Sequence, residues 1–365
     1  MSHRGCTQEG MLVTRGALID LLARHRPDDT AVETGEQQTF YKQLLDLTRA
    51  IREQITRSPA GPGPVVVADD PGAGACAAIA AAQSLGRAYI PLSANHPATR
   101  IQQILAAVEP ALIVQSDQTA ARMADALSGS YPLLTISRQL GNLSWARSPR
   151  PVASSASPVG SEVAYVMFTS GTTGRPKGVP VRTESLMAYL DVATKRFGVR
   201  PGDRASHFFD LTFDLSVHDI FVTLLGGGTL VVIPAEQRML PARFIREKQI
   251  SHWFSVPSAA ESLHRLGALR PGIFPQLRQT LFCGEPLRWP VAQACKPPHL
   301  IRASSTFTAR RKPRSRSLTT SYPAADRGRT TSTGSYRLAR SSKVSAAGSS
   351  AGLRRASNPI AVNCS

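Results

Sequence analysis

The chain has 365 residues, 42% of them hydrophobic, which is enough for two domains with buried cores. It contains no run of 18 or more apolar residues, residues 1–10 lack the apolar stretch of a secretory signal, and its five cysteines show no metal-ligand spacing. These features argue against a membrane span and against a metal site, and they favour a reduced, cytoplasmic setting. The net charge of +18 resembles a nucleic-acid-binding signal, but residues 296–365 hold 14 Lys and Arg against one acid, which leaves a net charge of +5 on the preceding residues.

Residues from about Leu12 to Cys295 are predicted to form alternating helices and strands, because their apolar residues recur at helical or strand spacing. Helices are predicted over 16–26, 39–55, 72–85 and 97–108, and strands over 30–33, 64–68, 88–92 and 111–115. This alternation predicts an α/β fold in which parallel sheets are wrapped by helices. The Ser- and Pro-rich residues 141–160 are expected to form a loop.

A strand-prone run from Val163 to Phe168 leads into a loop rich in glycine and hydroxyl groups. The residues of this loop that suit phosphate binding are Thr169, Ser170, Gly171, Thr172, Thr173, Gly174 and Lys177. Glycines let the backbone approach an anion, hydroxyl and N–H groups donate to its oxygens, and lysine adds positive charge. The common phosphate loop has Ser or Thr after its Gly-Lys pair, whereas Lys177 here lies between Pro176 and Gly178. A polar surface loop between two strands is the alternative.

The stretch from Thr169 to Gly178 resembles the signature loop of the adenylate-forming (AMP-binding) enzymes. That superfamily includes acyl-CoA synthetases, the adenylation domains of nonribosomal peptide synthetases and D-alanine-activating ligases. The resemblance implies that the loop holds the β- and γ-phosphates of ATP while an acid becomes an acyl-adenylate. It also implies ATP and Mg²⁺ as cofactors and a carrier-protein or CoA thiol as the acceptor.

Residues 86–92, followed by His96-Pro97 and Arg100-Ile101, are most similar to the amino-acid-activating branch, although a buried strand and a helix start would explain much of this segment. Farther on, apolar residues repeat at helical spacing after Phe213, which places Asp214 beside a helix start. A partly buried carboxylate needs a cation or several donors, and a plain helix cap would supply the donors.

Residues 213–216, Phe-Asp-Leu-Ser, resemble the Phe-Asp-x-Ser motif of amino-acid-activating domains. The resemblance implies that Asp214 pairs with the substrate's α-ammonium and that Leu215 and His218 line the side-chain pocket. His218 could then select a small or polar substrate, or it could be an ordinary packing or surface residue. No catalytic residue is assigned.

Two further segments are similar to the same family. Residues 253–257 resemble the strand and turn behind the substrate pocket, and within 280–287 the resemblance implies that Gly284 and Glu285 pack beside the adenine and the acyl group. One departure is Thr183, which stands where many relatives carry a histidine six residues after the loop lysine.

The composition changes after Cys295. Residues 296–365 are rich in Ser, Thr, Arg and Ala and are predicted to be disordered, because they offer too little apolar surface to offset chain entropy. The family's next motif, Tyr-Gly-Pro-Thr-Glu, is missing in this reading frame. One choice of codons for Tyr-Gly-Pro-Thr-Glu-Ala-Thr-Ile-Ala, read one nucleotide out of frame, gives the sequence of residues 308–316. A frameshift between about residues 285 and 308 is therefore our hypothesis.

The expected organisation is an incomplete large domain of an adenylate-forming enzyme over residues 11–295 and a basic, low-complexity tail over 296–365. By lineage the chain would convert an amino acid and ATP to aminoacyl-AMP and pyrophosphate. Because the adenine, Mg²⁺, ribose and catalytic-lysine motifs are missing, little or no turnover is expected. One alternative is a non-catalytic fragment whose tail binds nucleic acid or acidic surfaces non-specifically, by charge alone. Another is an unstable product without function. Neither a specific nucleic acid nor a membrane is expected as a partner.

Overall fold

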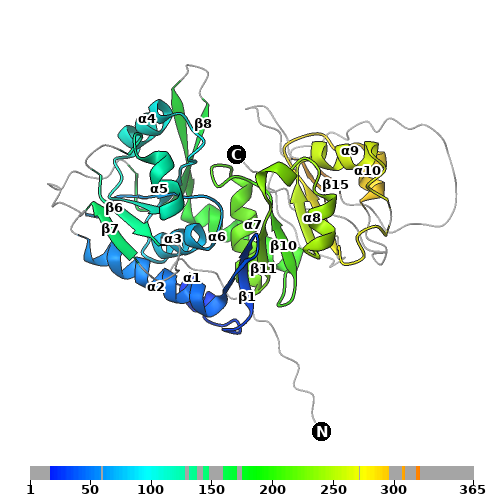
Figure 1. Ribbon diagram of the computed structural model, residues 1–365, viewed down its shortest axis with the longest axis horizontal. Coiled ribbons are helices and arrows are strands. Elements are labelled where there is room, and N and C mark those ends of the chain that lie inside the picture. The colour runs from blue at the N-terminus through cyan, green and yellow to red at the C-terminus, as the bar shows by residue number, and fades with distance from the viewer. Residues whose placement is uncertain are drawn as a thin grey trace, which may run out of the picture.

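The computed structural model describes residues 17–58, 61–127, 131–137, 143–147, 159–170, 175–270, 272–295, 306–308 and 318–320. Two sheets, each accompanied by helices, make up most of this part of the chain (Figure 1). The α/β class predicted from the sequence is confirmed. Among the described residues, no helix is long and apolar enough to cross a membrane.

The larger sheet has seven strands in the order β7-β6-β5-β3-β4-β8-β9. Its strands are β3 (Val65–Ala68), β4 (Tyr89–Pro91), β5 (Leu112–Ser116), β6 (Leu133–Ile136), β7 (Leu143–Arg147), β8 (Val163–Ser170) and β9 (Pro176–Arg182). The pairs β6–β7 and β8–β9 are antiparallel, and the strands between them are parallel as predicted. The prediction of a loop over 141–160 was wrong for β7, whose alternating exposure is typical of an edge strand and which pairs with β6.

The smaller sheet has six strands in the order β13-β12-β10-β11-β1-β2. Its strands are β1 (Thr30–Thr34), β2 (Gln37–Phe40), β10 (Arg204–His207), β11 (Thr229–Val232), β12 (His252–Ser255) and β13 (Gln279–Phe282). Only β1–β2 is antiparallel. The helix predicted from residue 39 begins at Tyr41 instead, because Phe40 is extended and pairs within β2, while its N–H donates to the Gln43 side chain at 3.0 Å.

Helices on the two faces of the larger sheet pack against alternate residues of the same strand. Val65 and Val67 belong to an inner apolar cluster with α3, whereas Val66 and Ala68 belong to an outer cluster with α4 and α5. The inner cluster contains residues from α1 (Ala17–Leu22), α2 (Tyr41–Arg57), α3 (Ala73–Ser84), α6 (Thr183–Phe197) and α7 (Leu215–Gly226). The outer cluster contains residues from α4 (Ala98–Val108) and α5 (Asp117–Met123).

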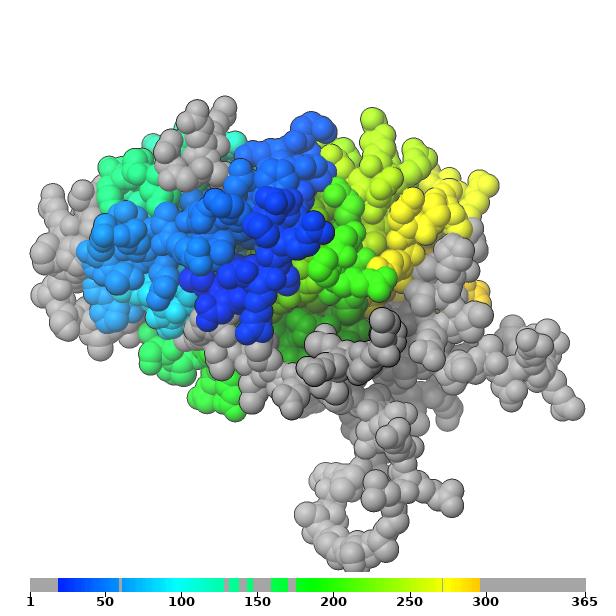
Figure 2. Space-filling view, turned by 90° about the horizontal axis from the view of Figure 1, so that it is seen from below, coloured from blue at the N-terminus to red at the C-terminus, as the bar shows by residue number. Residues whose placement is uncertain are grey.

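The inner cluster also includes residues from the smaller sheet, so one apolar core joins the two sheets. The N-terminal segment lies across this junction, because β1 pairs with β11 of the smaller sheet while α2 packs on α3 beside the larger one (blue in Figure 2).

The remaining elements are η1 (Ala235–Gln237), α8 (Ala242–Glu247), α9 (Pro257–Arg265), α10 (Trp289–Ala294) and the antiparallel pair β14 (Thr306–Thr308) and β15 (Leu318–Thr320). The disorder of the segment 296–365 stays a prediction.

Candidate nucleotide and amino-acid site

The predicted phosphate loop connects β8 and β9, an antiparallel hairpin at one edge of the larger sheet. Thr169 pairs with Lys177 and Ser170 with Pro176, so the two strands lead directly into the loop. Lys177 is exposed. The other predicted loop residues, Gly171, Thr172, Thr173 and Gly174, lie outside the described residues. The hairpin therefore places a hydroxyl residue and an ammonium group at facing positions where the loop begins and ends.

Asp214 stands at the N-cap position of α7 but makes no side-chain cap hydrogen bond. Its φ of −59° and ψ of −24° are already helical, whereas a capping residue is usually extended. The cap that local sequence offered as an alternative role for Asp214 is thus not formed.

Other residues hold the turn before α7. Asp210 Oδ1 accepts hydrogen bonds from the Thr212 N–H at 3.0 Å and the Thr212 hydroxyl at 2.7 Å, and the Ser216 hydroxyl donates to the Phe213 carbonyl at 2.6 Å. The sequence analysis gave no role to Asp210, although an Asp side chain that accepts from the backbone N–H two residues on is typical of such a turn.

His218 lies on α7 one turn beyond Asp214 and is buried. Its Nδ1 is 2.6 Å from the Tyr189 hydroxyl on α6, and its ring meets the rings of Phe197 and Phe254 edge-on at centroid distances of 4.8 and 4.9 Å. Burial, and to a lesser extent the neighbouring His252, lowers the pKa of His218 to about 3. His218 is therefore a neutral hydrogen-bonding group. The alternative that His218 is a surface residue was wrong, because its side chain is buried.

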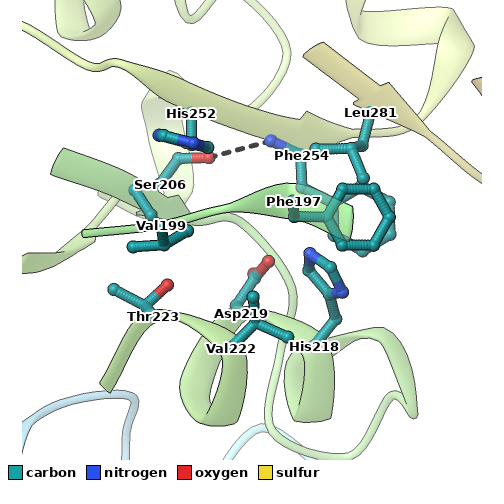
Figure 3. A pocket seen from close by; sticks show the side chains of 11 residues that line it. Phe197, Val199, Ser206, His218, Asp219, Val222, Thr223, His252, Phe254 and Leu281 are labelled. Atoms are coloured by element: carbon teal, nitrogen blue, oxygen red, sulfur yellow. Dashed lines mark hydrogen bonds between the residues drawn. The ribbon is translucent and has the colours of Figure 1, made fainter. Parts of the chain in front are cut away.

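A small cavity lies between α7 and the smaller sheet, with a volume of about 10 Å³, which is room for one water molecule. Figure 3 shows His218 pointing from α7 toward Phe254 and Phe197, with Asp219 beside it. The residues that line the cavity are Phe197, Val199, Ala205, Ser206, His218, Asp219, Val222, Thr223, His252, Phe254 and Leu281.

The cavity brings together only some of the expected residues. His218 lies in its lining with Phe254 and Leu281, whereas Asp214 and Leu215 are not among the lining residues, and Leu215 instead packs against the inner core. Phe254 and Leu281 belong to segments that resembled the family, but the sequence did not single them out. Both residues lie in strands, where alternate side chains point to the same face of the sheet. That pattern in the sequence indicates which side chains share a face, but it does not show which residue of another element lies against them.

His207 and Asp219 form a second buried polar pair, and Asp219 also lines the cavity. Asp219 Oδ2 is 3.2 Å from His207 Nδ1 and accepts a hydrogen bond from the Phe208 N–H at 3.0 Å. Complete burial raises the pKa of Asp219, although His207 acts in the opposite direction. The pair fixes the end of β10 over α7, and no motif in the sequence pointed to it.

The predicted adenine-side residues occupy a turn after β13. Glu285 accepts hydrogen bonds from the Ser258 N–H at 2.9 Å and from the Ser258 hydroxyl at 3.2 Å, so its carboxylate holds the first turn of α9. Gly284 has a φ of +92°, which glycine adopts without strain. These contacts are structural, and the contact of Gly284 and Glu285 with adenine stays a prediction.

Hydroxyl and ammonium groups at the hairpin suit the phosphates of ATP. For Mg²⁺, the described part of the chain holds no group of three or more His, Cys, Asp or Glu residues placed as metal ligands. These residues alone do not form a Mg²⁺ site.

Comparison with known proteins decides the family. The model of the AMP-binding enzyme family matches residues 20–298. The chain belongs to the AMP-binding enzyme family. That match agrees with the two-sheet α/β fold and with the hairpin loop that resembled the family in sequence, and it runs from within α1 to beyond α10.

Relatives of this AMP-binding protein include amino-acid-activating ligases. It is 34% identical over 219 residues to an L-proline–[L-prolyl-carrier protein] ligase of Pseudomonas fluorescens, covering 58% of this chain and 43% of the relative. It is 31% identical over 284 residues to the phosphinothricin tripeptide synthetase PhsC of Streptomyces viridochromogenes, covering 76% of this chain and 25% of the relative. The chain thus spans less than half the length of these relatives.

Solved structures show the same fold. The Vibrio cholerae adenylation domain AlmE, in complex with glycyl-adenosine-5'-phosphate, matches with a TM-score of 0.68 at 25% identity, covering 85% of this chain and 61% of that one. IdnL7 matches with a TM-score of 0.69 at 28% identity, covering 86% and 64%. The chain thus shares its fold with solved adenylation domains, and the relatives that it matches in sequence include an amino-acid ligase and a peptide synthetase.

Proposed function

We propose that this AMP-binding protein recognises ATP and an amino acid for conversion to aminoacyl-AMP and pyrophosphate. In that reaction a carboxylate oxygen of the amino acid bonds to the α-phosphorus of ATP, and the bond from that phosphorus to the bridging oxygen breaks, so that pyrophosphate leaves. The observation that carries the proposal is the position of Asp214, which stands at the start of α7 without serving as its cap. Asp214 stands one turn before His218, whose side chain lines the cavity, and its carboxylate would pair with the substrate's ammonium group there.

The residues divide between the two substrates. Thr169, Ser170, Gly171, Thr172, Thr173, Gly174 and Lys177 would bind the β- and γ-phosphates of ATP, in support of which β8 and β9 place Thr169 opposite Lys177. Mg²⁺ bound to the nucleotide would neutralise part of the phosphate charge. The described residues would bind and orient the two substrates.

The neutral ring of His218 and the small size of the cavity that it lines favour a small or polar amino acid side chain over a large one. The cavity's volume of about 10 Å³ and the aromatic edges of Phe197 and Phe254 leave little room beyond His218. With a pKa lowered to about 3, His218 would offer a hydrogen bond rather than a charge. We further propose a carrier-protein thiol as the acceptor, since a relative's name includes an L-prolyl-carrier protein.

We expect the chain to bind its substrates even if it catalyses the reaction poorly. Residues 296–365 contain no Tyr-Gly-Pro-Thr-Glu motif, so groups that stabilise charge in the transition state would be missing, and each such group commonly contributes about 10²–10³ in rate. We therefore propose that the chain binds both substrates but exchanges pyrophosphate slowly or not at all.

The test is calorimetric titration of the intact chain with ATP and Mg²⁺, alone and with each of the common amino acids. We expect ATP binding that one or a few small or polar amino acids strengthen. Asp214→Asn should weaken amino acid binding about 10- to 100-fold, the usual effect of a hydrogen bond to a charged group. Asp46→Asn is the matched control, because Asp46 is an exposed residue of α2. If no amino acid binds, or both variants bind alike, the proposed role of Asp214 is wrong.

A further inference from the structure

Arg100 contacts the backbone at the base of the phosphate-loop hairpin. This residue lies in the first turn of α4, and its Nη2 donates a hydrogen bond to the Phe168 carbonyl at 3.3 Å. Phe168 immediately precedes Thr169. Helix α4 also contacts β9, the other strand of the hairpin. One helix therefore touches both strands that carry the loop.

The end of β8 needs such a contact, because its neighbouring strand stops short. On the β4 side, β8 is paired only where Tyr165 faces Tyr89, whereas on the β9 side its pairing continues to Ser170. Figure 1 shows the β8 end of the hairpin near α4. A backbone carbonyl beyond the last β4 partner requires a donor from elsewhere. Arg100 provides that donor for Phe168.

The side chain of Phe168 is held from the other strand. Gly178 faces Phe168 in the register, and a Cβ added to Gly178 would lie 3.0 Å from Phe168 Cζ and 3.0 Å from Val166 Cγ1. The Phe168 ring therefore covers Gly178, while the Phe168 carbonyl is bound by Arg100. Together these contacts fix the last residue before the loop from two directions.

The hydrogen bond to the Phe168 carbonyl needs only a donor and does not by itself explain why residue 100 is charged. Among the described residues no carboxylate lies within 4.0 Å of it, and its Nε is buried without an acceptor. A neutral donor would satisfy the carbonyl at a lower desolvation cost. An uncompensated guanidinium at the base of the hairpin favours an anion nearby.

The same segment reaches the amino-acid side of the site. The Ser93 hydroxyl donates to Asp210 Oδ2 at 3.3 Å, and Asp210 holds the turn that precedes Asp214. His96 lies between Ser93 and Arg100, and its Nδ1 is also buried without a partner in the described part. Residues 93–100 thus link the hairpin of the larger sheet to the start of α7.

We propose that Arg100 is a positioning residue that fixes the end of β8, and with it Thr169 and Lys177, for the phosphates of a nucleotide. The nucleotide part of this inference rests on the proposed function, whereas the restraint on β8 does not. Arg100 acts through the Phe168 carbonyl and through its charge, and the hydrogen bond from Ser93 to Asp210 links the same segment to the turn before Asp214.

The test compares Arg100→Met, Arg100→Lys and the control Arg122→Met in the full chain. Methionine keeps the apolar stem without donor or charge, and lysine keeps one donor and the charge. Arg122 suits as a control because it pairs with Asp70 at the surface of the same sheet. The readouts are hydrogen exchange of residues 163–182 and of β3 and β5, the urea midpoint, and the Kd for ATP with Mg²⁺.

We expect Arg100→Met to speed exchange at the end of β8 and in β9 about tenfold, with β3, β5 and the urea midpoint close to wild type. ATP binding should weaken about tenfold, and Arg100→Lys should recover part of both losses. Unchanged exchange in Arg100→Met, or a rise spread evenly over the chain, overturns the inference.

The variants also separate this inference from the proposed function. If wild-type protein binds no ATP while Arg100→Met still loosens β8, the restraint stands and the nucleotide proposal fails. If Arg100→Met does not fold, Arg100→Lys decides: exchange and ATP affinity equal to those of Arg122→Met overturn the inference, whereas a change confined to the hairpin supports it.

Discussion

Asp69 shows how burial changes the chemistry of one residue. It follows β3 and is buried, and its Oδ1 accepts hydrogen bonds from the Ser116 hydroxyl at 2.5 Å and the Asp70 N–H at 2.9 Å. Burial raises the pKa of Asp69 to about 6, and the hydrogen bonds from Ser116 and Asp70 only partly oppose it. Between about pH 4 and pH 6 the folded chain therefore holds a proton at Asp69 that the unfolded chain has lost.

Stability should accordingly fall as the pH rises through this window, because the unfolded state binds fewer protons there. The expected loss due to Asp69 is about 2 to 3 kcal/mol between pH 4 and pH 7. Asp69→Asn should remove that part of the pH dependence, whereas Asp70→Asn, at a more exposed carboxylate paired with Arg122, should not. Urea unfolding at several pH values measures both. An equal slope in Asp69→Asn and wild type would contradict the prediction.

At the scale of the element, the start of α9 depends on a residue far along the chain. Val256, at the N-cap position, makes no side-chain cap hydrogen bond, and Glu285 from the turn after β13 accepts from Ser258 instead. A helix start held in this way joins β13 to α9. The sequence suggested a ligand role for Glu285, and the structure adds a structural one.

Glu285→Ala should lower the free energy of unfolding by about 1 to 2 kcal/mol, the usual cost of losing a helix cap. Glu53→Ala is the control, since Glu53 makes an exposed ion pair with Arg57 on α2, which is worth about 0.3–0.5 kcal/mol. Chemical denaturation gives both values. A loss in Glu285→Ala no greater than in Glu53→Ala would show that the carboxylate does not hold α9.

At the scale of the whole molecule, the two sheets share one core. The inner cluster draws residues from both, and Tyr41 of α2 donates to the carbonyls of Leu224 at 3.2 Å and Gly228 at 2.8 Å, beside the smaller sheet. The N-terminal segment therefore belongs to both halves, and removing its contacts should affect both together.

We expect the two sheets to unfold in a single transition. Trp145 of β7 reports on the larger sheet and Trp253 of β12 on the smaller one. Variants that keep only one of these two, with Trp289 replaced in both, should give the same urea midpoint. Tyr41→Phe should lower both midpoints equally, at a cost of about 1 to 3 kcal/mol for the carbonyls left unsatisfied. Thr56→Ala on the exposed face of α2 is the control. Separate midpoints for the two tryptophans would mean that the shared core does not couple the sheets.

The sequence by itself determined the α/β class, most of the elements through residue 115 and the family, because strand and helix periods are local and the motifs are contiguous. The resemblance placed His218 in the substrate pocket; the structure shows that His218 lines a small cavity, and its contact with a substrate stays a prediction. Only the tertiary structure decided that Asp214 is not a helix cap, that Phe254 and Leu281 face His218, and that Arg100 reaches the end of β8. These contacts join segments far apart in the chain, and a local pattern shows which face of an element is buried but not which residue lies against it.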